Sequence, residues 1–231
     1  LADEIVDTFH EQDKKCLLEE FETETFEAVG RGLSTNPIIH AYQITANLYN
    51  IDNTLLKAFF KSMKMDLYRL DYNDESFHEY IYGSAEVVGL MCLKIFTKGD
   101  DNMFQNLKGG AKALGSAFQK VNFLRDMQED FEERGRSYFP GVDFLNFTQE
   151  QKVLIEHDIS NDFKAARMAI LSLPESSRVG VYLAYKYYLK LFKKIRQAPA
   201  EDILKQRFRV PDIEKIYVLA NTYCRSVIGA L

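Results

Sequence analysis

Two pairs of aspartates with helical spacing are the residues of this chain best suited to do chemistry. Asp3 and Asp7 stand four residues apart near the start, and Asp126 and Asp130 repeat this spacing past the middle. Four residues make about one helical turn, so both carboxylates of each pair lie on one helix face. Two such helices facing each other would offer hard oxygen ligands to divalent cations such as Mg²⁺. Cations held in this way are what diphosphate chemistry needs.

The first pair, taken alone, also has an ordinary interpretation. Acidic residues four apart commonly mark a solvated helix face, where like charges roughly 6 Å apart repel by only ~0.7 kcal/mol. The second pair belongs to a polar stripe that interrupts an otherwise apolar helix face. On a helical wheel this stripe contains Gly115, Gln119, Asn122, Asp126 and Asp130. Buried carboxylates are costly unless they are paired, so we expect cations at this stripe.

The composition fits one sizeable domain that spans residues 1 to 231. Of these residues 46% are hydrophobic, which is enough for a buried core. The formal net charge of −5 argues against a nucleic-acid binder. The charge is unevenly spread, because residues 186 to 209 hold eight bases against two acids. This basic segment could meet the phosphates of a ligand, although a solvated basic face is the more ordinary interpretation.

The cysteines and the apolar runs bear on the compartment. Cys16, Cys92 and Cys224 are odd in number and widely spaced, which indicates neither a disulfide framework nor a zinc motif. No run of about 18 apolar residues predicts a membrane span, and the acidic start is not a signal peptide. We therefore expect a cytoplasmic protein. It begins without Met, inside an expected helix, so we expect the natural chain to start earlier.

Helical periodicity dominates the sequence and predicts an all-α protein. Turn residues fall between the periodic segments, for example Pro140 with Gly141, and Thr148 with Gln151 resembles a capping box. The expected helices cover residues 2 to 12, 16 to 30, 37 to 49, 53 to 66, 75 to 97, 101 to 132, 149 to 172, 175 to 197 and 212 to 229.

Residues 80 to 89 place small side chains inside one of these helices. Gly83 and Gly89 each cost about 1 kcal/mol relative to Ala in a helix, so something requires the space. Close packing of another helix would explain it, and so would a bulky ligand. One face of this helix would carry Tyr80, Ser84, Val87, Met91 and Ile95. That face would suit the wall of an apolar tunnel with a phenol at its mouth, but core packing would look much the same.

Other kinds of active site are poorly matched. Helical bundles can hold di-iron through Glu-x-x-His motifs on two helices, but only Glu75 and His78 have this spacing. No glycine-rich phosphate loop, nucleophile elbow or dinucleotide-binding fingerprint occurs in the sequence. These absences argue against the commonest kinases, hydrolases and dehydrogenases.

Three segments resemble the squalene and phytoene synthase family. The run QKVNFLRDMQED at residues 119 to 130, followed by ERGRSYFP at residues 133 to 140, resembles the family's second signature. The run DEIVD at residues 3 to 7 resembles its first aspartate motif, and residues 80 to 89 resemble its central helix. The resemblance covers essentially the whole chain, and the motifs are most similar to those of phytoene synthases.

The resemblance implies an all-α isoprenoid synthase fold, in which two aspartate-rich helices face each other across a central cavity. The implied metal set is Asp3, Asp7, Asn122, Asp126 and Asp130. Tyr80 matches the family's active-site tyrosine and joins the four aspartates as a catalytic residue. The implied substrate-binding residues are Gln119, Asn122, Arg125, Arg134, Arg136, Tyr188 and Arg207. The matches of Tyr188 and Arg207 are more local, and Arg134 and Arg136 would also serve as ordinary helix-end cations.

The resemblance also implies a reaction. Two geranylgeranyl diphosphates would be joined head to head to phytoene through a cyclopropylcarbinyl diphosphate, with Mg²⁺, or Mn²⁺ in its place, and without NADPH. A squalene or dehydrosqualene synthase that uses farnesyl diphosphate is one alternative, and a catalytically silent assembly or lipid-binding member is another. We expect peripheral contact with a membrane because the product is so apolar. The family normally has a further helix before the first aspartate motif, and we expect that this sequence lacks it.

Overall fold

The computed structural model describes residues 1–9, 11–68 and 71–227, without the side chains of Glu133, Arg134 and Val227. Helices make up the regular structure of this described part, and its only strand-like pairing is an isolated bridge between Asp71 and Ser137. The predicted all-α class is therefore confirmed. No helix among the described residues is long and apolar enough to cross a membrane.

The helices follow the predicted segments closely, apart from the short α10, which was not predicted, and two further differences described below. Their bounds are α1 Ala2–Asp7, α2 Lys14–Arg31, α3 Pro37–Leu48, α4 Asn53–Tyr68, α5 Asp74–Ile81, α6 Val87–Phe96, α7 Asp101–Arg134, α8 Gln149–Leu171, α9 Glu175–Gln197, α10 Ala200–Ile203 and α11 Asp212–Val227. The predicted capping box of α8 is present, because Thr148 and Gln151 each bond the other's backbone N–H.

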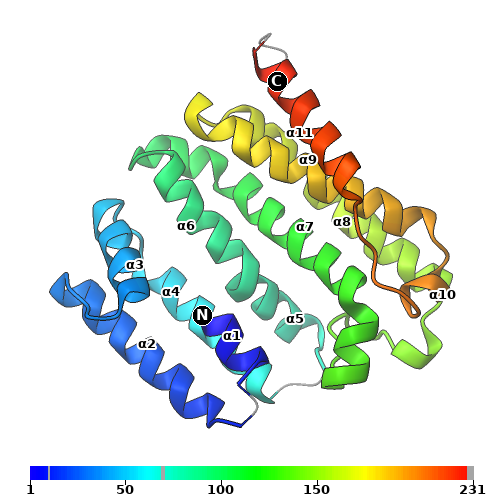
Figure 1. Ribbon diagram of the computed structural model, residues 1–231, viewed down its shortest axis with the longest axis horizontal. Helices are drawn as coiled ribbons and strands as arrows, with labels where there is room; N and C mark the ends of the chain where they lie inside the picture. The colour runs from blue at the N-terminus through cyan, green and yellow to red at the C-terminus, as the bar shows by residue number, and fades with distance from the viewer. Residues whose placement is uncertain (10, 69–70, 228–231) are drawn as a thin grey trace.

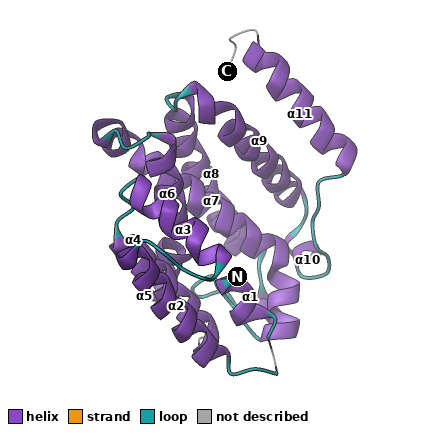
Figure 2. Ribbon diagram, turned by 60° about the vertical axis from the view of Figure 1, so that its left-hand side comes forward, coloured by secondary structure: helices purple, strands orange, loops and turns teal. Residues whose placement is uncertain are grey.

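The long helix α7 runs through the middle of the molecule (Figure 1). Helices α5 and α6 lie along one side of it, with α1 to α4 beyond them, and α8 and α9 pack on the other side. Helix α11 is the outermost element and runs beside α9, as Figure 2 also shows. The central position of α7 brings its polar stripe between the two halves of the helical array.

The first helix is shorter than predicted, which is the first exception. It ends at Asp7 instead of residue 12, and residue 10 lies outside the described part. Asp13 caps a new helix by accepting a hydrogen bond from the Cys16 N–H at 3.0 Å. Lys14 of this second helix donates to the carbonyl of Val6 at 2.8 Å, which satisfies one of the backbone oxygens that the end of α1 leaves unpaired.

The helix predicted over residues 75 to 97 is interrupted by a π-helical turn, Tyr82–Glu86, which is the second exception. The backbone comes very close to α4 here: a Cβ added to Gly83 would lie 2.4 Å from the carbonyl oxygen of Ala58. Gly89 similarly approaches the carbonyl of Ala111 on α7. Close helix packing thus accounts for both glycines. A π turn inserts one extra residue, so every side chain after it is rotated by about 100° relative to the predicted face.

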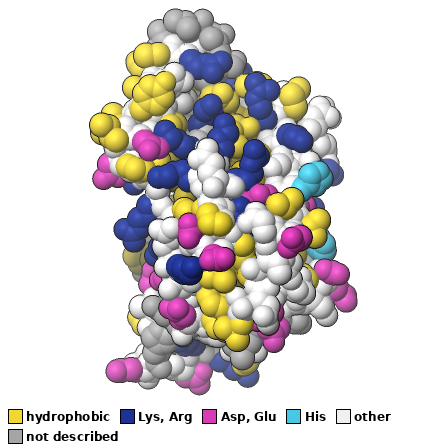
Figure 3. Space-filling view, turned by 90° about the vertical axis from the view of Figure 1, so that its right-hand side faces the viewer, with side chains coloured by type: hydrophobic (Ala, Val, Ile, Leu, Met, Phe, Trp, Pro, Cys, Tyr) yellow, Lys and Arg dark blue, Asp and Glu magenta, His cyan; other side chains and the backbone are white. Residues whose placement is uncertain are grey.

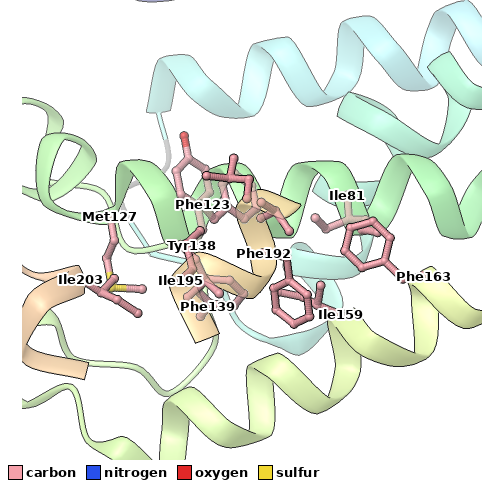
Figure 4. Close-up of a cluster of buried hydrophobic side chains, with 14 of the residues drawn as sticks. Ile81, Phe123, Met127, Tyr138, Phe139, Ile159, Phe163, Phe192, Ile195 and Ile203 are labelled. Carbon is pink, nitrogen blue, oxygen red and sulfur yellow. The ribbon is translucent and has the colours of Figure 1, made fainter. Parts of the chain in front are cut away.

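The main core lies where α5, α7, α8 and α9 meet. Its side chains are large and mostly aromatic or branched, and Figure 4 shows them interleaved between these helices and the loop after α7. Phe123 of α7 stacks on Tyr138 with a centroid distance of 3.9 Å and an angle of 6° between the rings. The rings of Phe163 on α8 and Phe192 on α9 pack together with 5.6 Å between their centroids. This packing holds the polar stripe of α7 in one orientation.

Candidate active site

A cavity of about 860 Å³ lies between α6, α7 and α9. One wall comes from α7 and contains Leu107, Gly110, Ala111, Leu114, Gly115, Phe118, Gln119 and Asn122. The facing wall contains Ser84, Ala85, Val88, Gly89, Cys92, Ile95 and Phe96, and α9 adds Gly180, Val181, Ala184 and Tyr188. This volume is in the upper part of the range for small-molecule sites, roughly 300 to 1,000 Å³. The mostly apolar wall suits an apolar ligand.

The wall differs from the predicted face of the central helix. Ser84 and Ile95 line the cavity as predicted, but Val87 is fully buried in a separate cluster and Met91 contacts the hydroxyl of Tyr42. Val88 and Cys92 take their places. The one-residue shift from the π turn is the physical reason for this difference. For Val87 and Met91 the structure therefore supports core packing, which was the other interpretation of this face.

Polar side chains gather at one end of the cavity. Gln119 and Asn122 of α7 lie there with Tyr188 of α9. The Tyr188 hydroxyl donates to Oδ1 of Asn122 at 3.3 Å. The Tyr188 ring stacks on that of Phe118 with 3.9 Å between the ring centroids. The ring is fixed by Phe118 and the hydroxyl by Asn122. The structure thus brings together three of the predicted substrate-binding residues.

Asp126 follows Asn122 by one helical turn and is held by two arginines. Nε of Arg125 bonds Oδ1 of Asp126 at 2.9 Å, and Nε of Arg207 lies 2.8 Å from the same oxygen. Arg207 also pairs with Oε2 of Glu129 at 2.9 Å. Hydrogen bonding to Asp126 raises the pKa of Arg125. The carboxylate thus has its charge balanced by guanidinium groups, in accord with the prediction that it needs cations.

A second polar cluster surrounds Arg136, which follows the end of α7. Gly135 ends the helix with a φ of 63°, so the chain reverses and the buried Arg136 side chain points back into the protein. Its Nη2 donates to the backbone oxygen of Asp66, and its Nη1 donates to the Tyr138 hydroxyl at 3.3 Å. The same Nη1 lies 3.7 Å from Oδ1 of Asp7. Arg136 therefore ties the first aspartate motif to the segment after the second.

Tyr80 belongs to this second cluster. Its side chain is 4% exposed and its hydroxyl donates to Oδ2 of Asp66 at 3.0 Å. The ring of Tyr72 meets that of Tyr80 edge-on, with 5.1 Å between their centroids. The centroid of the Tyr138 ring lies 5.4 Å from that of Tyr80. Burial raises the pKa of Tyr80 well above its usual value, and the Asp66 carboxylate adds to this effect. Tyr80 does not line the large cavity, so it is not the phenol at its mouth.

Asp66 is the functional candidate that sequence reasoning missed. It is 6% exposed on α4, and its Oδ1 has no hydrogen-bond partner, although Nη1 of Arg136 lies 3.6 Å away. Burial raises the pKa of Asp66 to about 7. The charge of Arg136 and the hydrogen bond from Tyr80 act in the opposite direction and lower this pKa. The charges of Asp7 and Asp3 raise this pKa further. A single acid on the apolar face of an amphipathic helix, between Met65 and Leu67, was the available signal.

The predicted site residues thus fall into three groups. Gln119, Asn122 and Tyr188 close the cavity, while Arg125, Asp126 and Arg207 form an ionic group one turn further along α7. The third group contains Asp7, Tyr80 and Arg136, with Asp130 buried beside Arg136 at a small cavity. Asp3 is exposed on α1. The side chain of Arg134 lies outside the described part of the structure.

The carboxylates of the two aspartate motifs have the donor atoms of a metal site. Among the described side chains, no three of His, Cys, Asp and Glu come together in a way that could hold an ion. The donors nevertheless fit Mg²⁺ in kind, because all are hard oxygens, and Oδ1 of Asp66, which accepts no hydrogen bond, adds another beside Arg136. In this structure guanidinium groups balance the charges of Asp7 and Asp126.

Comparison with known families gives one match along nearly the entire chain. The family model described as squalene/phytoene synthase matches residues 1–214. Phytoene synthase 2 of Solanum lycopersicum is 25% identical over 202 residues, which are 80% of this chain and 64% of that protein. Phytoene synthase of Arthrospira platensis is 26% identical over 228 residues, 88% of this chain and 73% of that protein. The chain spans about half to two thirds of the length of its plant relatives.

Two solved structures share the fold. A squalene synthase, HpnC, from Alicyclobacillus acidocaldarius superposes with a TM-score of 0.73 at 21% identity, covering 85% of this chain and 78% of the other. A dehydrosqualene synthase in complex with a ligand superposes with a TM-score of 0.76 at 21% identity, covering 96% of this chain and 81% of the other. The predicted isoprenoid synthase fold is therefore confirmed.

Proposed function

This chain belongs to the squalene/phytoene synthase family, and on that basis we propose that it joins two geranylgeranyl diphosphates head to head to form phytoene. The cavity beside α7 is the observation that carries this proposal. Its wall follows α7 from Leu107 to Asn122, about 22 Å at ~1.5 Å per residue. An extended geranylgeranyl chain is roughly 20 Å long, estimated from single carbon–carbon bonds of about 1.5 Å.

The polar end of the cavity is where the diphosphate would bind. Arginine binds phosphate with the same two-pronged geometry that Arg125 and Arg207 use toward acids here. Asn122 and Gln119 add amide groups at the cavity end, and Tyr188 orients Asn122. These residues would hold the diphosphate and its ester oxygen at the polar end, with the prenyl chain directed along the apolar wall.

The proposed reaction breaks two carbon–oxygen bonds and releases two protons. The first diphosphate leaves, the double bond of the second substrate attacks the allylic cation, and loss of a proton closes a cyclopropane ring. The second diphosphate then leaves, the carbon skeleton rearranges, and a second proton is lost to give phytoene. Electrons balance without a reductant, so NADPH is not required. The apolar wall keeps water from the cations, and the Phe118 ring can stabilise positive charge.

Divalent metal is part of the proposal. Asp3, Asp7, Asn122, Asp126 and Asp130 would hold Mg²⁺, or Mn²⁺ in its place, and the bound ion would withdraw charge from the leaving diphosphate. Arg125 and Arg207 balance Asp126 in this structure, so these two guanidinium groups are positioned to shift to the diphosphate when the acid binds a metal. We propose a cytoplasmic enzyme of carotenoid biosynthesis.

A C15 substrate is the second candidate. The two structural neighbours are a squalene synthase and a dehydrosqualene synthase, which favours farnesyl diphosphate. The length of the cavity wall favours the longer chain. A third possibility, a catalytically silent lipid-binding member, has less support because Asp3, Asp7, Asp126 and Asp130 are all present.

Product analysis tests the proposal directly. The protein is incubated with Mg²⁺ and either geranylgeranyl or farnesyl diphosphate, with and without NADPH, and the organic extract is analysed by mass spectrometry. We expect a C40 hydrocarbon from geranylgeranyl diphosphate without NADPH. If only farnesyl diphosphate gave a product, a C30 hydrocarbon, the proposed substrate would be wrong, but the head-to-head reaction would still hold. Metal-dependent diphosphate binding without any product would favour the silent member.

A further inference from the structure

Tyr49 lies at the end of the large cavity that is opposite its polar end. The cavity wall follows α7 from Asn122 back to Leu107, near the start of this helix. Tyr49 comes directly after α3 and packs against an apolar core cluster. Three members of this cluster also line the cavity: Leu93, Leu107 and Leu173. The Tyr49 side chain therefore stands between the far end of the cavity and the rest of the cluster.

The distribution of charge sets the direction in which an anionic ligand with an apolar tail would lie. Helix α3 is at the left of Figure 1 and α10, which contacts α7, is at the right. Figure 3 looks onto the side of α10 and α11, and Lys and Arg side chains gather there. Arg125 and Arg207 lie toward the same end of α7. A diphosphate drawn to this end would leave its tail pointing along the cavity toward Tyr49.

A tight turn fixes the position of Tyr49. Its N–H donates to the carbonyl of Thr45 at 3.1 Å, which completes the last turn of α3. Asn50 follows with a φ of 49°, a left-handed conformation that Asn tolerates better than most residues. The N–H of Ile51 then donates to the carbonyl of Ala46 at 2.9 Å, and the Ile51 side chain is buried in the same apolar cluster. The Tyr49 ring is thus carried by a rigid helix end.

The other side chains at this end of the cavity differ from Tyr49. The three leucines and Phe96 belong to α6, to α7 and to the residues just after α8, which form the side walls. Lys98 and Ser176 also line this end, but both are exposed. Among the described residues that line the cavity, only Tyr49 precedes α5, so it approaches from outside the side walls. A tail too long to end at Tyr49 would meet water near Lys98, which is unfavourable.

We propose that Tyr49 sets the length of the prenyl chain that the cavity accepts. This inference rests on the proposed function and names the residue that would limit its substrate. With the ring present, the cavity ends at the apolar cluster. Without it, the space that the ring fills would join the cavity, and its new wall would still be apolar. The phenol ring is somewhat larger than one five-carbon prenyl unit, so its removal should admit one further unit.

A series of substrates that differ by one prenyl unit tests the proposal. The natural protein and Tyr49→Ala are incubated with Mg²⁺ and farnesyl, geranylgeranyl or geranylfarnesyl diphosphate, and kcat/KM is measured for each. The quantity compared is the ratio of kcat/KM for the next longer substrate to that for the substrate the natural protein prefers. We expect Tyr49→Ala to raise this ratio by at least about tenfold. An unchanged ratio in folded Tyr49→Ala would overturn the proposal.

Binding measured without turnover separates this inference from the proposed function. The thiolodiphosphate analogues of the same three substrates react very slowly, so their affinities can be measured by calorimetry. If the natural protein gives no product from any substrate, the proposed reaction is wrong, but the affinities still test Tyr49. Tyr49→Ala should then favour the next longer analogue by about tenfold relative to the natural protein. Equal affinity ratios in the two proteins would contradict a role of Tyr49 in chain length.

Three further variants serve as controls. Tyr49→Phe keeps the ring and should keep the natural ratio, because the proposal depends on the bulk of the ring and not on its hydroxyl. Tyr217→Ala removes a tyrosine that is 66% exposed on α11, away from the cavity, and should also keep the natural ratio. Circular dichroism shows whether each variant is folded. If Tyr49→Ala does not fold, Tyr49→Leu keeps an apolar side chain in the cluster and should shift the ratio in the same direction by at least about threefold. A natural ratio in folded Tyr49→Leu would equally contradict the proposal.

Discussion

The hydroxyl of Tyr80 donates a hydrogen bond of 3.0 Å to Oδ2 of Asp66, and both side chains are almost completely buried. The other carboxylate oxygen of Asp66 has no hydrogen-bond partner and faces Arg136 at 3.6 Å. Arg136 in turn reaches Asp7 in the first aspartate motif. The active-site tyrosine expected from the family is therefore oriented by an acid outside both aspartate motifs.

Asp66 should make the stability of the protein depend on pH. Burial raises its folded pKa from 3.8 to about 7, so its contribution is fully present below about pH 4 and is lost as pH rises through 7. Relative to Asp66→Asn, the free energy of unfolding of the natural protein should fall by up to about 4 kcal/mol over that window. Urea unfolding at several pH values measures this. A constant difference between the two proteins from pH 4 to 8 would show that Asp66 is not a buried titrating acid.

Replacing Asp126 should remove activity without unfolding the protein. Its carboxylate is paired with Arg125 and Arg207, which retain contact with solvent when it is gone. We expect Asp126→Ala to lose at least about a hundredfold in turnover, with a melting temperature close to that of the natural protein. Omission of Mg²⁺ should abolish turnover in the natural protein. Glu201→Gln, at an exposed surface acid, is the control and should keep full activity. Ordinary turnover by Asp126→Ala would remove this residue from the site.

Filling the cavity at Gly180 should shorten the accepted chain. A Cβ at Gly180 would meet nothing within 4 Å, and the residue lines the cavity on α9. Gly180→Leu should therefore fold normally and favour farnesyl over geranylgeranyl diphosphate by roughly tenfold in kcat/KM. Gly30→Leu, which also has open space but lies away from the cavity on α2, is the control. An unchanged preference in Gly180→Leu would argue that the prenyl chain lies elsewhere.

Two glycines of α7 should respond oppositely to alanine. A Cβ at Gly115 would lie 2.5 Å from the carbonyl oxygen of Ala85, whereas one at Gly109 would meet nothing within 4 Å. Gly115→Ala should destabilise the protein by about 1–3 kcal/mol because the π turn and α7 must separate. Gly109→Ala should stabilise it by about 0.5–1 kcal/mol through its better helix propensity. Thermal unfolding of the two variants is the measurement, and equal effects would contradict the close approach.

Local signals in the sequence account for most of the helices. The capping box of Thr148 and Gln151 and the proline at the start of α3 act through bonds within a few residues, so they can be predicted without tertiary structure. The polar stripe of α7 was predictable for the same reason. A continuous helix fixes the relative directions of Gly115, Gln119 and Asn122, and all three line the cavity.

The sequence by itself determined that the chain is helical, that α7 carries a polar stripe, and to which family its motifs belong. Tertiary structure decided which wall faces that stripe, because the π turn after Tyr80 rotates the rest of the central helix. It also decided that Asp66 meets Tyr80 and Arg136, from three segments distant in sequence. The physical reason is range: helix caps and periodicity act over a few residues, whereas burial and charge pairing depend on every element that packs around a side chain.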